Sequence, residues 1–451
     1  MTGNQASPAR PGLRAPQTAT ARPHDPAGHH AAGRRPAELP LAAVPKKSAR
    51  YAPLLAGGAA AAVLAMAAAP AMASTTGGRD TVIAMTIAKI LKKGDIVTGV
   101  RGTTNGNVIL TGSQATGQGE DALPFLYQGP LASAAEDRPV SVLHPPFPGG
   151  IKTATFYGPD TNSFNPDTIP AGQIRAVGSY QTMTTPPGGN RFVINHGMVY
   201  LGPVNGQGGS WTSIDVPADG RGTAGGVRAC PPDQPGCFVM DTIAHSTMGD
   251  LVVGNYDLNL GHGVSGNAFI YNMSTQRWTL LQLGGSLASQ TTLYGIWQNG
   301  GPGSPDYTLA GGSSVHGSSP SGNQRAFLMT YNEQTGTFGR PQFYNYGNTP
   351  QLFTHFDGIT AVPGGFNLAA ISSAQDSSLA FVPLTGRHRP FGQATWYPID
   401  VARSSLCSTG CGMVTANTVD QNNVMGLYEY EPAPGTGTYV PGTYLATVPT
   451  P

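Results

Sequence analysis

Charged residues are scarce in this chain. They make up 11% of its 451 residues, and 25 Lys and Arg nearly balance 24 Asp and Glu, which gives a formal net charge of +1. This balance implies no basic face, so nucleic acid is a poor candidate partner. The shortage of carboxylates also disfavours an enzyme, and no G-x-S-x-G elbow, P-loop or H-E-x-x-H motif occurs. We therefore expect neither a cofactor nor a metal centre.

Cysteine is also rare, and its spacing is informative. The four cysteines form two local pairs, Cys230 with Cys237 and Cys407 with Cys411, and each pair brackets turn-forming residues. A zinc site built from four cysteines has C-x2-C-like spacing, which these gaps do not match. We predict two disulfides that each staple one loop, as in proteins of an oxidising compartment.

The N-terminal region has a composition of its own. Residues 1–45 are rich in Ala, Pro and Arg and lack an apolar period, which predicts a disordered low-complexity segment. Residues 46–73 have the order of a signal peptide, with a basic start, an apolar run and a cleavage site at Ala71-Met72-Ala73. We expect a secreted, extracellular protein without a stable membrane span after cleavage; an uncleaved membrane anchor is the alternative. Residues 74–94 form a short leader whose pattern fits a helix or a first strand.

The 62 Gly and 40 Pro supply many tight turns and disfavour a helical protein.

Three parts of the chain are near-copies of one another. The copies are residues 266–271 leading into 277–280, residues 325–328 leading into 336–338, and residues 379–382 leading into 394–397. Each reads as a strand with small and aromatic residues, a turn and a second strand. A period of roughly 50 residues is typical of a solenoid, a propeller or an array.

The repeated unit contains four strands, which we name A to D in chain order. The expected A strands are residues 96–100, 156–158, 242–246, 293–297, 355–359 and 413–416, and residues 443–447 are expected to form the outer edge of the last unit. Isolated four-stranded units are unstable in water, and joining them into a ring buries their faces and removes the free ends. We predict an all-β propeller over residues 95–451 with six four-stranded blades. Five or seven blades are the alternatives, and an open β-solenoid is the rival fold.

The repeats resemble those of the HAF-repeat proteins, an extracellular bacterial family. The likeness rests on the Ala-Phe pairs at 268–269, 326–327 and 380–381 and on Tyr294-Gly295-Ile296, and it is clear over about residues 240–375. The His of the family's His-Ala-Phe triplet is replaced here by Asn267, Arg325 and Leu379. The resemblance implies a secreted β-propeller-like domain without a defined reaction.

The inner strands of a propeller line its central channel. At equivalent positions of these strands the sequence offers five candidate ligand-binding residues: Thr98, Tyr157, His245, Tyr294 and Asp357. Such a ring fits a sugar or another polar small molecule. His245 and Asp357 are a candidate general acid–base pair, and Tyr294 is the third candidate catalytic residue. The alternative is that these side chains only satisfy one another and the water of the channel.

The long loops are expected on one face of the ring, which the B-to-C and D-to-A connections share. They are residues 182–195, 217–240, 257–266, 313–324 and 402–411, and both predicted disulfides fall among them. Binding residues are common on loops that a rigid scaffold holds. The reachable ionisable groups of this face are expected to be His262, His316 and His355.

Three functions remain open from the sequence. The leading hypothesis is a monomeric, non-catalytic secreted propeller that binds a glycan, a cell-envelope component or a protein through its loop face. The alternative is an extracellular polysaccharide hydrolase or lyase with its site at the central channel. The third is a structural surface protein. An enzyme requires titratable groups that converge on one pocket, and this requirement separates the hypotheses.

Overall fold

The computed structural model describes residues 86–449, except 93, 117–120, 132–139, 185–191, 261–263, 284–289, 315–323, 350–352, 387–389, 409 and 434. The predicted disordered segment 1–45 and the predicted signal peptide 46–73 lie outside the described residues. The described part contains no helix with both the length and the hydrophobicity needed to cross a bilayer. Its helices are short 3-10 turns, namely Ala224–Gly226, Tyr346–Asn348, Val401–Arg403 and Ser405–Cys407.

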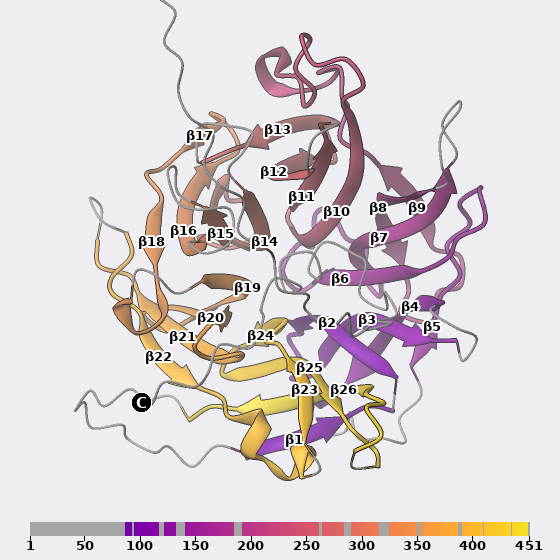
Figure 1. The fold of residues 1–451 in the computed structure, drawn as a ribbon. Helices are drawn as coiled ribbons and strands as arrows, with labels where there is room; N and C mark the ends of the chain where they lie inside the picture. Colours follow the sequence, from indigo (N-terminus) through magenta and orange to yellow (C-terminus); the bar gives the residue numbers. More distant parts are fainter. Residues whose placement is uncertain are drawn as a thin grey trace, which may run out of the picture. The chain divides into compact units, whose positions relative to one another are not determined.

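The structure is all-β, and its strands form antiparallel units of about four strands that follow one another along the chain (Figure 1). The first unit is β2 (Asp95–Gly102), β3 (Val108–Ala115), β4 (Ala122–Gly129) and β5 (Ser141–Val142). An eight-stranded sheet follows, with β6 (Ala154–Thr161), β7 (Ile174–Thr184), β8 (Phe192–Gly202) and β9 (Ser210–Ile214), then β10 (Phe238–Met248), β11 (Leu251–Asn259), β12 (Val264–Asn272) and β13 (Arg277–Leu281). Its two halves meet in a single parallel bridge between Asn195 and Asp241.

Three further sheets complete the arrangement. One holds β14 (Thr291–Gln298), β15 (Asp306–Ser314), β16 (Gln324–Asn332), β17 (Thr337–Phe338) and β18 (Gln342–Tyr344), the last two being separate pieces of the outer strand. The next holds β19 (Thr354–Val362), β20 (Gly365–Ser372), β21 (Ser378–Pro383) and β22 (Thr395–Pro398). The last holds β23 (Cys411–Val414), β24 (Thr418–Asp420), β25 (Asn423–Tyr430), β26 (Val440–Thr447) and β1 (Thr86–Ile90). In Figure 1 the sheets surround a common centre, which confirms the predicted propeller arrangement.

Strand β1 closes the ring by joining the first described residues to the last. It pairs antiparallel with β26, with Thr86 opposite Thr447 and Ile90 opposite Thr443. The sequence left a helix or a first strand open for the leader 74–94, and its residues 86–90 form the strand, because the backbone of β1 completes the ladder of the final sheet. The outer edge of that sheet is β1, and the segment 443–447, which we expected at the edge, lies inside it. Strand β1 thus covers the edge of β26 and becomes the outer edge itself.

Each of the first five inner strands contains a β-bulge, and this bulge explains the repeated glycines of the sequence. The register shifts directly around Thr98, Tyr157, His245, Tyr294 and Asp357. Four glycines lie opposite the bulges, namely Gly112, Gly178, Gly254 and Gly311. A Cβ on any of them would overlap a backbone carbonyl oxygen of the inner strand, which belongs to the residue two positions before the bulge. A glycine is required where two backbones approach this closely.

A second glycine follows four of the bulges and allows neighbouring units to touch. A Cβ on Gly99 would overlap the carbonyl oxygen of Tyr157, and one on Gly158 would come within 2.6 Å of the carbonyl oxygen of His245. Gly358 similarly faces the backbone of Thr418. The inner strands therefore pack backbone against backbone around the centre, which keeps the channel narrow.

The hydrophobic core lies between the units. One cluster joins Leu251 and Val253 of β11 to Leu293 and Leu309 of the next sheet. Another joins the first unit to the last through Val100 and Met425, and it includes Leu91 beside β1. The amphipathic strands thus bury their faces against neighbouring units, as the predicted ring requires.

Both predicted disulfides are confirmed. Cys230 and Cys237 are bonded with a Cα–Cα distance of 5.7 Å in the connection before β10. Cys407 and Cys411 are bonded at 5.2 Å in the connection before β24. Both connections lead from an outer strand to the next inner strand, so the two disulfides lie on the face that we predicted for the long loops.

We expect Gly99→Ala to destabilise the fold by about 3 kcal/mol, because the added methyl group must displace backbone of the neighbouring unit. The control is Gly106→Ala, which faces open space and has a φ of +77°. Its cost is the backbone strain alone, about 1–2 kcal/mol. Urea unfolding of both variants measures the difference, and equal midpoints would contradict the close-packing argument.

Candidate functional site

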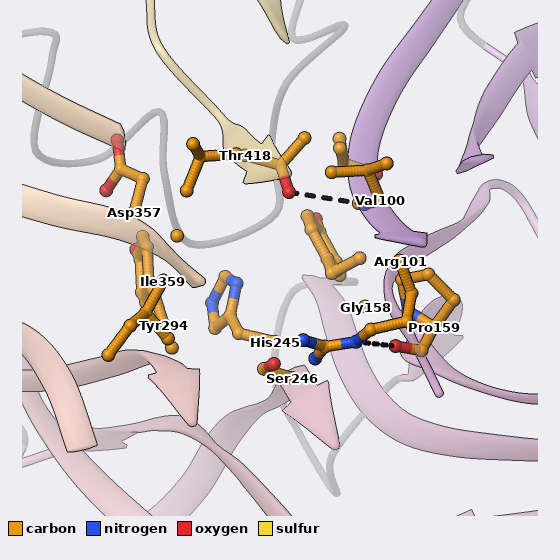
Figure 2. Close-up of a pocket in the computed structure, with 16 residues that line it drawn as sticks. Val100, Arg101, Gly158, Pro159, His245, Ser246, Tyr294, Asp357, Ile359 and Thr418 are labelled. Carbon is orange, nitrogen blue, oxygen red and sulfur yellow. Dashed lines mark hydrogen bonds between the residues drawn. The ribbon is translucent and has the colours of Figure 1, made fainter. Parts of the chain in front are cut away.

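A small cavity lies at the centre of the ring, and inner strands of every sheet line it. Its volume is about 20 Å³, which is room for one or two water molecules. The lining comes from residues 98–101, 157–159, 245–246, 294–295, 357–359 and 418–419. Figure 2 shows His245, Tyr294 and Asp357 around this space, with hydrogen bonds from Arg101 to Pro159 and from Val100 to Thr418.

All five residues that we predicted from the sequence line this cavity, and each is the bulge residue of its strand. They are Thr98, Tyr157, His245, Tyr294 and Asp357. A bulge leaves one residue out of the ladder and re-aims its side chain, and bulges are common beside active sites. The backbone irregularity thus turns one polar or aromatic side chain from each of these strands towards the same space.

Aromatic rings continue from strand to strand across the cavity. The His245 ring stacks on Tyr294 with 3.7 Å between centroids, and Tyr157 lies on the other side at 4.8 Å. Tyr294 also packs against His355 at 4.5 Å. Burial lowers the pKa of His245 to about 3 and raises the pKa of Tyr157 to about 12, so both side chains are neutral near pH 7.

The predicted acid–base pair of His245 and Asp357 does not form a hydrogen-bonded pair. His245 Nε2 lies 2.6 Å from Asn255 Oδ1, while Asp357 bonds to His355 Nδ1. The reason is the register, because Asp357 and His355 lie two residues apart on either side of Phe356, and the bulge brings their side chains together. The expectation that His355 is reachable from solvent is wrong, since its side chain is 5% exposed. His262 and His316 lie outside the described residues.

His355 connects Asp357 to a hydroxyl on the neighbouring sheet. Its Nε2 lies 2.6 Å from Thr292 Oγ1 of β14. The carboxylate only accepts, so His355 Nδ1–H donates to Asp357. Burial raises the pKa of Asp357, and the positive charge of His355, followed by its hydrogen bond, opposes that rise. We call these three hydrogen-bonded residues the Thr292–His355–Asp357 relay. It fixes the orientation of Asp357 inside the channel.

A pair of carboxyl groups lies on β10 and β11, towards the loop face. Asp241 and Asp257 are opposite each other in the ladder and share a hydrogen bond. Asn195 Nδ2 donates to Asp241 Oδ1 at 2.5 Å, which favours the charge on Asp241. Burial and then the negative charge of Asp241 raise the pKa of Asp257 to about 8, so the pair holds one proton at neutral pH. Asp257 is half-buried.

The opposite end of the cavity is occupied by a buried cation. Arg101 donates from Nε to the carbonyl oxygen of Pro159 at 3.3 Å, and its guanidinium lies 5.2 Å from the Trp297 ring. Burial raises the pKa of Asp160 to about 6, although Arg101 and Arg175 oppose the rise. The channel is therefore filled at this end by packed charged and aromatic side chains.

Sequence reasoning missed several of these groups. Asp241 lies four residues before the His245 bulge, directly after a second register shift of β10, and Asp257 lies opposite it on β11, so neither occupies a position that the repeats mark. The last inner strand was placed at 413–416, but the residues that reach the cavity are Thr418 and Val419. In the described part no three His, Cys, Asp or Glu side chains gather as a metal site.

Comparisons with known proteins identify no family. No family model and no curated protein matches the chain. Solved structures with a related arrangement include an α-L-arabinofuranosidase from Fusarium graminearum, at 11% identity and a TM-score of 0.44, covering 79% of this chain and 98% of the other. An α-L-arabinanase from Penicillium chrysogenum has 8% identity and a TM-score of 0.43, covering 80% and 98%. A sialidase from Trypanosoma rangeli has 8% identity and a TM-score of 0.43, covering 81% and 58%.

These structures go against our leading expectation from the sequence, a non-catalytic binding protein. The three proteins are named as enzymes that act on glycans, so we no longer hold that expectation. At such identities and TM-scores the likeness assigns no substrate and no catalytic residue to this chain. Those assignments depend on the geometry of the site.

The carboxyl pair predicts a pH dependence of stability between pH 6.5 and 8. In this window the unfolded chain has Asp257 ionised, whereas the folded state keeps its proton, so the free energy of unfolding falls as the pH rises. The slope is at most about 1.4 kcal/mol per pH unit. His245, with its folded pKa of about 3, is neutral in the folded state, whereas the unfolded imidazole is half protonated at pH 6.5. It therefore adds a slope of opposite sign near the lower end of the window, and this contribution is the same in the wild type and in an Asp257 variant.

Asp257→Asn should flatten this slope, because the variant has no proton to lose at that position. Urea unfolding at pH 6.5, 7.25 and 8 measures the slope in both proteins. Identical slopes would show that the two carboxyl groups do not share a proton in the folded protein.

Proposed function

We propose that the protein is an extracellular glycan-hydrolysing enzyme whose site lies at the mouth of the central channel, on the loop face. The observation that carries this proposal is a pair of carboxyl groups that shares a proton, Asp241 and Asp257, together with a central cavity that is lined by Asp357 and neutral ring side chains. Hydrolysis of a glycosidic bond needs a carboxylic acid to protonate the leaving oxygen and a carboxylate to assist at the sugar ring.

Asp257 is the general acid in this proposal. It is half-buried and holds a proton at neutral pH because of its burial and the neighbouring Asp241. A carboxyl group with a raised pKa is suited to giving a proton to a leaving oxygen. Asp241 lies within hydrogen-bond reach of Asp257, too close for a sugar to fit between them, so its role is to hold that proton in place.

Asp357 is the second carboxylate. The Thr292–His355–Asp357 relay fixes one of its oxygens and leaves the carboxylate beside the cavity. Tyr294 links the two groups, since its pKa is raised first by burial and then by the charges of Asp357, Tyr157 and Asp257. In this proposal the neutral Tyr294 hydroxyl is a hydrogen-bond donor to the substrate.

The size of the cavity decides where a sugar would bind. A space of about 20 Å³ accepts water but no monosaccharide. The sugar therefore binds above it, at the loop face, and Asp357 acts on the sugar through a water molecule held in the cavity, as the base of an inverting hydrolase does. The face carries both disulfides, which reduce the cost of ordering its loops on binding.

The same proposal includes features that the sequence suggested. We propose a ring of six four-stranded blades over residues 95–451, with β1 added to the last blade; inner strands of six successive units around the cavity support this number. We also propose secretion through the segment 46–73, for which the disulfides are favourable. Membership of the HAF-repeat family stays a prediction, supported by the strand repeats of residues 240–375.

A panel of nitrophenyl furanosides and pyranosides, together with plant and bacterial polysaccharides, tests the proposal. We expect turnover of at least one glycoside, and a fall in kcat of about 10²–10⁴-fold in Asp257→Asn and in Asp357→Asn. Loss of the acid should also remove the alkaline limb of the pH profile near pH 8.

Asp306→Asn is the matched control. Asp306 is exposed at the start of β15, and its side chain accepts a hydrogen bond from Asn332 Nδ2. Its kcat should stay unchanged. A wild-type protein without turnover on the whole panel, or an Asp257→Asn variant with full activity, would refute the proposed reaction.

A further inference from the structure

A second Thr–His–Asp relay lies on the β7–β9 hairpins, apart from the cavity. Thr182 Oγ1 of β7 is 3.0 Å from His196 Nε2 of β8, and His196 Nδ1 is 3.0 Å from Asp215 Oδ2, which directly follows β9. The relay in the channel has the same three residue types but is buried. Here the side chains of His196 and Asp215 are 24% and 48% exposed, so small molecules can reach them.

The two contacts define the direction of proton transfer. The Asp215 carboxylate only accepts, so His196 Nδ1 carries the proton that lies between them. In the neutral imidazole, Nε2 is then an acceptor and faces the Thr182 hydroxyl. This is the order of groups that activates a hydroxyl nucleophile: a hydroxyl, a base within hydrogen-bond reach, and a carboxylate that orients the base.

Packing holds the imidazole in this orientation. The Tyr180 ring stacks on His196 with 5.0 Å between centroids and an interplanar angle of 24°. Phe147 stacks on the other side of Tyr180 at 4.3 Å, and the Tyr180 hydroxyl bonds to Ser213 Oγ at 2.9 Å. The base is therefore supported by a stack of rings.

A pair of exposed glycines lies beside the methyl group of Thr182. A Cβ on Gly149 would be 3.5 Å from Thr182 Cγ2, which is van der Waals contact. Gly149 and Gly150 are both exposed and have φ values of +104° and +68°. Because this backbone lies so close to the threonine, we expect the site to favour a small acyl group over a long acyl chain.

We propose that Thr182, His196 and Asp215 form a second catalytic site, which hydrolyses esters that have a small acyl group. The Thr182 hydroxyl attacks the ester carbonyl and passes its proton to His196 Nε2. The C–O bond to the alcohol then breaks, and the alcohol leaves with that proton, which gives an acyl-threonine. A water molecule, deprotonated by His196, attacks the acyl-threonine, and the carboxylic acid leaves as Thr182 regains its proton.

Two measurements on the full-length protein test this site. The first is hydrolysis of 4-nitrophenyl acetate and 4-nitrophenyl octanoate, with the acetate expected to react faster. We expect at least tenfold slower acetate turnover in Thr182→Ala and His196→Ala and an intermediate loss in Asp215→Asn. Thr182→Ser should retain turnover, because a primary hydroxyl is less hindered. The control is Thr184→Ala, two residues further along β7, which should be unchanged.

The second measurement is labelling of the wild-type protein with a fluorophosphonate, followed by peptide mapping, and it does not depend on the folding of any variant. An adduct on Thr182 supports the site, and an adduct elsewhere or none overturns it. Acetate turnover that survives in Thr182→Ala but disappears in His196→Ala would mean simple imidazole catalysis and would also overturn the proposal. Equal rates of acetate hydrolysis in Thr182→Ala and Thr184→Ala would also overturn the proposal.

Discussion

The close approach of neighbouring inner strands is the constraint on which the rest of the structure depends. A bulge in each of the first five of these strands needs a partner strand that can come near its carbonyl oxygens, and glycines such as Gly112 and Gly254 allow this. The glycine after the bulge, as at Gly99 and Gly158, then lets the next unit pack against the same backbone. One backbone device therefore sets the width of the channel and turns a side chain into it.

The electrostatics of the centre follow from that width. A channel with room for only one or two waters cannot solvate free charges, so the His245 and Tyr294 rings are neutral and stacked, Asp357 is paired with His355, and the other charged groups lie at the two ends. At the loop face the Asp241–Asp257 pair keeps a proton, and at the other end Arg101 lies against Trp297. This separation provides a protonated acid beside solvent with a rigid, neutral layer beneath it.

The sequence was sufficient for the fold and for part of the site. Strand repeats with turn residues predict the all-β ring, and local cysteine spacing predicts both disulfides, because these are short-range patterns. The five bulge residues could be found because each sits at the same place in its repeat. Asp241, Asp257 and the His355–Asp357 bond could not, because they depend on which strands lie opposite each other and on the register shift at the bulge. The place of the first strand at the outer edge of the last sheet could not be predicted for a related reason: its partner β26 is at the other end of the described chain.

That last pairing has a consequence for how the molecule reaches its native state. Strand β1 finds its place only when β26 exists, so the final sheet unites residues from the two extremes of the described chain. Contacts between such distant segments carry a large loop-closure entropy and form slowly. The ring can therefore assemble unit by unit along the chain, and the pairing of β1 with β26 forms last, after the C-terminal strands have folded.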